Sequence, residues 1–333
     1  MSTPEADASA QLTVVNDDAV PAPGVLPRVR LVLLLLYGLV ALVVFWDVGI
    51  PFDREGVILW TCGALLIACI GRPPRDALVL VRDWIPFTLF LLAYDYTRGM
   101  ADTLGIPVRE HEMIVADEVA GAGRIPTVRL QQWLYDPAQV HWYDVAVTLV
   151  YISHFFAVYV IAGVLWARNR ERFGRFVRRF LALTTLGLAT YILFPATPPW
   201  LASQHGEVGD ISRISGRGWQ ALGLHRAESV LSKGQGTVNQ VAAMPSLHAA
   251  FAVLVCAFFW RAAPWWGRAL LLAYPVAMAF ALVYSGEHYL IDVAVGWVYV
   301  GAVMVGVAWL ERRWRDRRPP RPDPAIPDAA PTA

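Results

Sequence analysis

Long apolar runs separated by short charged stretches fill most of the chain after residue 28. Eight such runs carry few charges, at 29–46, 56–70, 84–97, 145–166, 180–194, 249–260, 269–284 and 289–310. A helix needs about 20 predominantly apolar residues to cross a bilayer, and the longest runs approach or reach that length. The pattern therefore predicts an all-α protein, a polytopic transmembrane helix bundle of about eight spans.

The composition supports this fold class. Apolar residues make up 56% of the 333 residues and charged residues only 17%, which is typical of a multi-span membrane protein. The net charge of +1 gives no reason to expect a nucleic-acid partner. The three cysteines, Cys62, Cys69 and Cys256, lie inside apolar runs, so we expect them to be buried, without a disulfide framework or a metal-binding spacing.

The polar segments between the runs divide the chain into four parts. Residues 1–27 lack the basic start of a secretory signal and are expected to be a disordered tail. Residues 28–143 hold the N-terminal spans and an extracytoplasmic cap, in which "IPTVRLQQWLYDP" predicts a short amphipathic helix at the interface. Residues 144–311 form a helical core that includes a long polar loop at 201–241, and residues 312–333 are a basic, Pro/Ala-rich tail expected to be disordered.

The distribution of basic residues predicts the topology. If both termini are cytoplasmic, nineteen of the 28 basic residues fall on the inner side, in short loops and flanks. This is the asymmetry of the positive-inside rule. The same topology places the polar ends of several runs on the outer face, among them those near Pro195, Ser246, Ser285 and Arg98.

Two segments combine titratable side chains with an apolar run, "AAMPSLHAAFAVLV" at 242–255 and "VYSGEHYLIDVAVG" at 283–296. An ionisable residue at the mouth of a membrane helix indicates a functional site, because lipid offers it no hydrogen-bond partner. His288 and Asp292 lie one helical turn apart, so the carboxylate can orient one imidazole nitrogen and leave the other free to attack. His248 lies at the start of the facing helix, where Ser246, Leu247 and unpaired backbone N–H groups favour an anion. A nucleophile, an orienting carboxylate and an acid together suit phosphoryl transfer through a phosphohistidine.

These motifs carry a family resemblance. "MPSLH", followed about forty residues later by "HYLID" and preceded by "FPATPP" at 194–199, resembles the type 2 phosphatidic acid phosphatase superfamily. The similarity is closest to its inositolphosphotransferase branch, which includes fungal inositol phosphorylceramide synthases, and it covers about residues 151–301. The resemblance implies that His288 is the nucleophile, Asp292 its orienting carboxylate and His248 the general acid. Ser246 and the adjacent backbone would hold phosphate oxygens.

The basic residues of the wider superfamily are missing from their usual positions. Its Lys-x6-Arg-Pro motif is absent, Leu282 stands six residues before His288, and Trp200 follows the prolines where related sequences often carry Arg. Another cation must then neutralise the phosphate. We nominate Arg98, with Arg213, Arg217 and Lys233 as further candidates.

Several residues keep an alternative interpretation. His154, near the centre of its run, is either a proton-relay or acceptor-site residue or the partner in an interhelical hydrogen bond. Glu287, beside the proposed nucleophile, either tunes it or replaces a base, or is an exposed turn residue, which is the favoured interpretation. His248, His288 and Asp292 would also be explained by a structural cluster that joins two helices. A zinc site is disfavoured because no third strong ligand accompanies the motif, so no metal or cofactor is expected.

The sequence thus predicts a metal-independent lipid phosphatase or phosphotransferase in the plasma membrane, most consistent with a bacterial protein, with its site facing outside. The donor would be a lipid phosphate or a phospholipid, and the acceptor water or an alcohol. A proton-coupled lipid transporter or flippase, with the same polar residues as a gate, is the alternative; it predicts paired midplane charges and inverted repeats. The identity of the lipid and the oligomeric state stay open.

Overall fold

The structure, a computed structural model, describes residues 25–47, 54–100, 104–223 and 239–317. All eight apolar runs form helices: α1 (Val25–Asp47), α2 (Arg54–Cys69), α3 (Pro74–Met100), α6 (Trp142–Arg168), α7 (Arg170–Leu193), α11 (Leu247–Phe259), α12 (Trp265–Tyr284) and α13 (Leu290–Asp316). Six of them are long and apolar enough to cross a membrane, whereas α2 and α11 are shorter apolar helices. The all-α class is confirmed, and the number of spans stays a prediction. The terminal segments 1–24 and 318–333 lie outside the described residues.

The start of α3 differs from the expectation. The helix begins at Pro74 rather than at Trp84, so Pro86 lies inside the helix and not in its first turn. Proline in a helix interior removes one backbone hydrogen bond. Membrane helices tolerate this loss where neighbouring helices, side chains or local adjustments satisfy the freed carbonyl. The additional turns carry Arg75 and Arg82, whose charges hid this part of the helix from a search for apolar runs.

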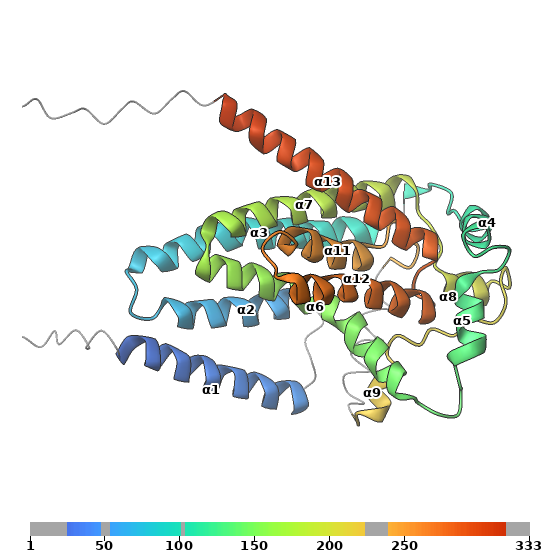
Figure 1. Cartoon of the computed structure of the whole chain (residues 1–333), viewed down its shortest axis with the longest axis horizontal. Helices are drawn as coiled ribbons and strands as arrows, with labels where there is room; N and C mark the ends of the chain where they lie inside the picture. The colour runs from blue at the N-terminus through green and yellow to red at the C-terminus, as the bar shows by residue number, and fades with distance from the viewer. Residues whose placement is uncertain (1–24, 48–53, 101–103, 224–238, 318–333) are drawn as a thin grey trace, which may run out of the picture.

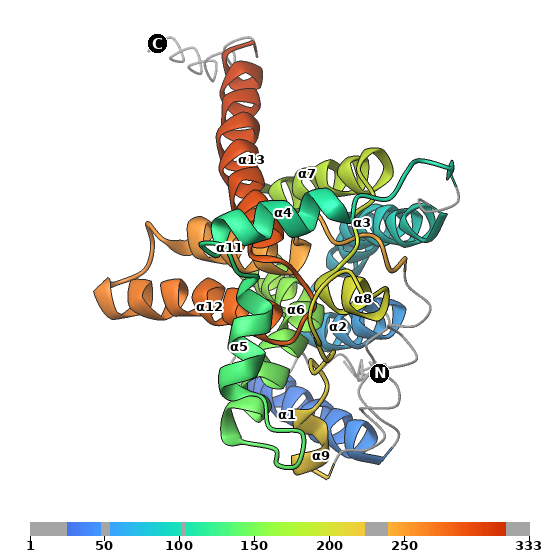
Figure 2. The ribbon, with the colours of Figure 1, turned by 90° about the vertical axis from the view of Figure 1, so that its right-hand side faces the viewer.

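Short helices cover one end of the bundle. The cap consists of α4 (His111–Ala120), α5 (Pro126–Leu134) and α8 (Pro199–Gln204), which gather at the right of Figure 1, with α9 (Gly218–Ala221) beside α6. The short helix predicted from "IPTVRLQQWLYDP" is therefore present as α5, and its place at the membrane interface stays a prediction. The described chain begins in α1 and ends in α13 at the opposite end of the bundle (Figure 1). The ends of α12 and α13 that enclose the turn 285–289 lie at the capped end, together with the start of α11 (Figures 1 and 2).

The start of α11 is packed tightly between α7 and α13. A Cβ atom on Gly187 of α7 would lie 2.8 Å from Leu247 Cδ2, and one on Gly296 of α13 would lie 2.6 Å from the Ser246 carbonyl oxygen. Glycine at these positions lets the helices approach more closely than any side chain would allow. Behind this contact, Leu247, Ala250 and Leu254 join the main hydrophobic core. The positions of Ser246 and His248 are therefore fixed by helix packing.

The Gly296→Ala variant is expected to lose about 1–3 kcal/mol of stability, because the added methyl group must displace the backbone at Ser246. Thermal unfolding of the purified protein in detergent, followed by tryptophan fluorescence, measures this loss. Gly301→Ala on the same helix is the matched control, since nothing lies within 4 Å of its added Cβ. A melting temperature as high for Gly296→Ala as for Gly301→Ala would show that the close contact does not exist.

Candidate active site

His288 and His248 face each other at the capped end of the bundle. Their ring centroids are 5.8 Å apart, although about forty residues separate them in sequence. The Nδ1 atom of His288 lies 3.4 Å from Oδ2 of Asp292. Asp292 is completely buried, and only 6% of His288 is exposed. With Nδ1 directed at the carboxylate, the Nε2 atom of His288 is the nitrogen left for chemistry.

Asp292 also fixes the local backbone. Its Oδ2 atom accepts a hydrogen bond from the Tyr289 N–H at 2.9 Å, which caps the first turn of α13. Its backbone carbonyl accepts a hydrogen bond from the Ser246 N–H at 3.0 Å. One residue therefore lies beside the His288 ring and joins the start of α13 to the start of α11.

The start of α11 is partly occupied by its own capping. The buried Ser246 hydroxyl accepts a hydrogen bond from the Ala249 N–H at 3.3 Å. The Leu247 side chain packs into the core, and its N–H lies against the Tyr191 hydroxyl, which donates to the Pro245 carbonyl at 2.8 Å. Together with the Ser246 N–H, which donates to the Asp292 carbonyl, three of the four N–H groups from Ser246 to Ala249 thus already have protein acceptors. The anion-binding capacity of this helix end is smaller than the sequence suggests.

Two rings of α6 lie against His248. The ring of His154 stacks on it with a centroid distance of 3.8 Å, and that of Tyr151 stacks at 5.1 Å. The Nε2 atom of His248 is buried and has no hydrogen-bond partner within the described residues. The side chain of His154 is thus placed at the histidine pair, a contact that depends on how α6 and α11 pack and leaves no signal in the sequence.

Two of the nominated cations lie near His248. Arg98 and Arg213 are both among the electrostatic neighbours of its ring. Arg98 ends α3, where its guanidinium lies 5.7 Å from the centroid of the Tyr94 ring. Arg213 comes from the loop that follows α8.

Arg217 is bound elsewhere. Its Nη2 atom donates hydrogen bonds to the carbonyls of Asp136 and Gln139, and its Nε atom lies 3.7 Å from Asp144 Oδ2. Its contacts hold the start of α6, so the structure does not bring Arg217 to the histidines. Lys233 lies outside the described residues.

Glu287 is buried, which corrects the expectation of an exposed turn residue. Only 8% of it is exposed, and its carboxylate accepts hydrogen bonds from Arg213 Nε at 2.8 Å and Arg213 Nη2 at 2.9 Å. Ser215 Oγ donates a further hydrogen bond at 2.6 Å. Burial opposes the charge on Arg213, but the negative charge of Glu287 raises the pKa of the guanidinium above its usual value.

The loop after α8 buries Glu287 because it folds over the turn between α12 and α13. The Ile214 N–H donates to the Ser285 carbonyl at 3.1 Å. Gln131 of α5 donates to the carbonyls of Ser212 at 2.8 Å and Tyr284 at 2.9 Å, joining the loop to the end of α12. The sequence of this loop has no periodicity, so neither the loop contact nor the role of Gln131 was foreseen.

Asp117 in the cap is a second buried acid that the sequence did not single out. It is completely buried, and its Oδ1 atom accepts a hydrogen bond from the Ile291 N–H at 3.2 Å. A side chain of α4 thus caps the first turn of α13, next to Asp292. Burial raises the pKa of Asp117 to about 6, and the nearby Asp292 charge adds to the effect.

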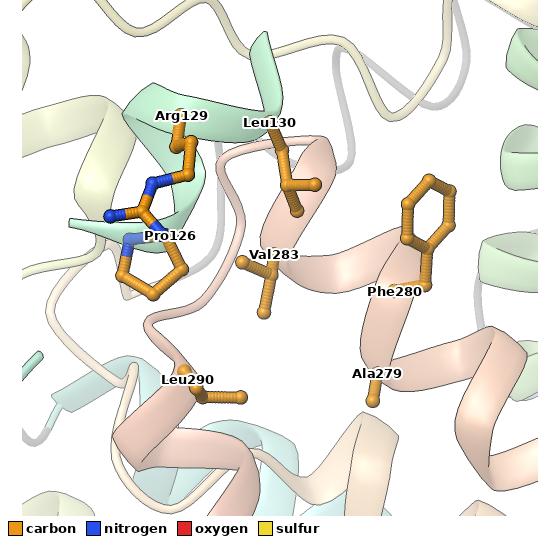
Figure 3. Close-up of a pocket in the computed structure, with 7 residues that line it drawn as sticks. All are labelled: Pro126, Arg129, Leu130, Ala279, Phe280, Val283 and Leu290. Carbon is orange, nitrogen blue, oxygen red and sulfur yellow. The ribbon is translucent and has the colours of Figure 1, made fainter. Parts of the chain in front are cut away.

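A groove of about 320 Å³ lies outside this cluster. Figure 3 shows its lining: Pro126, Arg129 and Leu130 of α5, Ala279, Phe280 and Val283 of α12, and Leu290 of α13. The histidines do not line it, so the groove is distinct from the candidate site. Among the described residues there is also no group of three His, Cys, Asp or Glu side chains placed to hold a metal ion.

Comparisons with known proteins indicate the family of the chain. The sequence model of the PAP2 superfamily matches residues 125–306, more than half of the chain and inclusive of both polar segments. The phosphoinositol dihydroceramide synthase of Bacteroides thetaiotaomicron is 27% identical over 265 residues, which cover 73% of this chain and 80% of the relative. No solved structure matches the chain at a significant level.

The pKa of Asp117 predicts a pH-dependent effect on stability. The rise from 3.8 to about 6 means that the folded state binds the proton more tightly, so ionisation of Asp117 destabilises the fold as pH rises from about 4 to 6. Above pH 6 the ionisation of Asp117 lowers the free energy of unfolding by about 3 kcal/mol at most. Asp117→Asn keeps an acceptor for the Ile291 N–H and removes the charge. Its melting temperature should exceed that of the unchanged protein at pH 8, and the difference should disappear towards pH 4.

The exposed neighbour provides the control for this measurement. Glu118→Gln removes a carboxylate from the solvent-exposed side of the same helix and should show no such pH dependence. A melting-temperature difference for Asp117→Asn that is the same at pH 4 and pH 8 would contradict the burial of an ionisable carboxyl at this position.

Proposed function

The chain belongs to the PAP2 superfamily, and we propose that it is an inositolphosphotransferase that moves phosphoinositol from a phospholipid to the hydroxyl of a ceramide-type lipid. Family membership and the relative make it a multi-pass membrane enzyme of lipid phosphate chemistry, a lipid phosphotransferase or phosphatase. The observation that supports phosphoryl transfer is the convergence of His248, His288 and Asp292 at one end of the bundle, and the choice of phosphoinositol and ceramide rests on the relative.

In the first step, Nε2 of His288 attacks the phosphorus atom of the donor. A P–N bond forms while the P–O bond to the lipid alcohol breaks, and His248 gives its proton to the departing alkoxide. Asp292, at 3.4 Å from Nδ1, stabilises the positive charge that develops on the His288 ring. The product of this step is a phosphohistidine that carries the inositol phosphate.

In the second step, His248 removes the proton from the acceptor hydroxyl. The acceptor oxygen attacks phosphorus, the P–N bond breaks, and His288 is regenerated. With a ceramide-type alcohol the product is a phosphoinositol ceramide, and with water it is inositol phosphate. His154 stacks face to face on His248, and because proton transfer follows the ring plane, we assign His154 a positioning role instead of a relay.

The negative charge on the phosphate needs cations and N–H donors. Arg98 and Arg213 approach His248 from α3 and from the loop after α8, and both are assigned to the phosphate oxygens. Ser246 and Leu247 keep a smaller role, in which they shape the start of α11 and present the backbone N–H of His248. Arg217 is not included, since its contacts lie at the start of α6.

We place the site on the outer face of a bacterial plasma membrane. The positive-inside rule supports this orientation, because the arginine-rich flanks such as 168–179 and 312–317 lie at the end of the bundle opposite the cap (Figure 1). In this arrangement residues 144–311 are the catalytic core, and the cap of α4, α5 and α8 covers its outer end.

A lipid transporter that uses the same polar residues as a gate is the competing proposal. It places paired ionisable groups across the path of the lipid, near the centre of the membrane. The cluster here lies at the capped end of the helices, under the loop that carries Arg213. A transporter also moves lipid without chemical turnover, which gives a direct test.

The test uses purified protein, phosphatidylinositol labelled in the inositol ring, and ceramide. We expect labelled phosphoinositol ceramide to form only when ceramide is present, and turnover to fall by about 10²–10⁴-fold or more in His248→Ala and His288→Ala. His205→Ala, which alters an exposed histidine paired with Glu110 in the cap, is the control and should stay active. If labelled inositol phosphate is the main product, water is the acceptor and the protein is a phosphatase instead of a transferase. Movement of intact lipid across vesicles without any product would favour the transporter.

A further inference from the structure

Glu287 stands directly before the proposed nucleophile, and its charge is buried. Its exposed fraction is 8%, and that of the Arg213 side chain is 27%. A buried carboxylate is costly unless a cation and hydrogen-bond donors compensate it. Both are supplied by the loop after α8, through Arg213 and the Ser215 hydroxyl. The burial of this charged pair therefore indicates a role besides holding the turn in place.

The geometry of the pair orients the guanidinium. Glu287 takes the edge formed by Nε and Nη2 of Arg213, at 2.8 Å and 2.9 Å. Glu287 does not use the Nη1 end, and the Tyr151 side chain is a further neighbour of the guanidinium. Tyr151 in turn stacks on the His248 ring at 5.1 Å. The guanidinium is thus placed near the histidine pair, and Arg213 is an electrostatic neighbour of His248.

Trp200 supports the same guanidinium from another side. The Arg213 Cζ atom lies 4.6 Å from the centroid of the Trp200 ring, within the range of a cation–π interaction. The backbone N–H of Trp200 donates to the Gly286 carbonyl at 3.2 Å, which ties this tryptophan to the turn that carries Glu287. Gly286 has φ +76°, and a Cβ there would lie 2.9 Å from Ile211 Cγ2, so only glycine suits this contact between loop and turn.

We propose that Glu287 is a positioning residue, whose carboxylate holds the Arg213 guanidinium against Trp200 so that its free end reaches the phosphate at His288. The inference rests on the proposed function, because it assumes a phosphate to be neutralised. It also gives Trp200 a role, since the guanidinium rests on its indole ring.

A purely structural role for the pair makes a different prediction. If Glu287 and Arg213 only fasten the loop to the turn, removal of either residue lowers the stability of the protein. Any fall in activity then follows from the lower stability. If Glu287 acts through Arg213, its removal impairs catalysis only while Arg213 is present. A double-mutant cycle separates these cases, because residues that act as one unit give non-additive effects.

The cycle compares the unchanged protein, Glu287→Gln, Arg213→Ala and the double variant in headgroup release from phosphatidylinositol. We expect Glu287→Gln alone to lower kcat/KM by about tenfold or more, and by less than about twofold when Arg213 is already alanine. Glu112→Gln, which breaks an exposed pair with Arg109 in the cap, is the matched control and should keep full activity. If the losses in kcat/KM of the two single variants multiply in the double variant, and follow a fall in melting temperature, the proposal is wrong.

Folding and the proposed function are tested separately. If Glu287→Gln does not insert or fold, Glu287→Asp takes its place, since it keeps the charge but shortens the reach to Arg213. An equal loss in kcat/KM with Arg213 present and with Arg213→Ala would again overturn the proposal. An unchanged protein without turnover on any phospholipid would refute the proposed function. Full additivity in an active protein would refute only the role of Glu287.

Discussion

The hydrogen bond from the Ser246 N–H to the Asp292 carbonyl, at 3.0 Å, is the contact on which the site depends. It joins the first turns of α11 and α13, beside two histidines that are about forty residues apart in sequence. Gly296 makes the bond possible, because any larger residue would press on the Ser246 carbonyl. The same Asp292 faces His288 through its side chain. Helix packing and the geometry of the proposed chemistry therefore rest on one residue of α13.

The cap reaches into this arrangement from outside the bundle. Asp117 of α4 binds the N–H of Ile291, and Gln131 of α5 binds the end of α12 and the loop after α8. That loop brings Arg213 to Glu287, and Trp200 lies against the guanidinium. The cap thus does more than cover the end of the helices. It supplies buried polar contacts to the start of α13 and to the end of α12.

The sequence predicted the parts of the molecule that have a periodic or motif-level signal. Apolar runs became helices, and the spacing of His288 and Asp292 placed their side chains together. Apart from the pairing of His248 with His288, which the motifs indicated, features that depend on non-local contacts were not predicted. Pro86 lies within α3 because charged turns extend the helix, and Glu287 is buried because a loop without periodicity folds over it. Arg213 and Arg217 looked equivalent in sequence, and only the path of that loop separates them.

The most direct test of the central claim is a single-turnover experiment on His288. The protein is mixed with phospholipid labelled in the headgroup phosphate, quenched in alkali within one turnover, and digested, and the labelled peptide is identified by mass spectrometry. The account predicts an acid-labile label on His288 that is lost on addition of the acceptor alcohol and accumulates when the acceptor is withheld. Product formation in the same time, with no label on His288 at any point, would contradict it and indicate direct transfer from donor to acceptor.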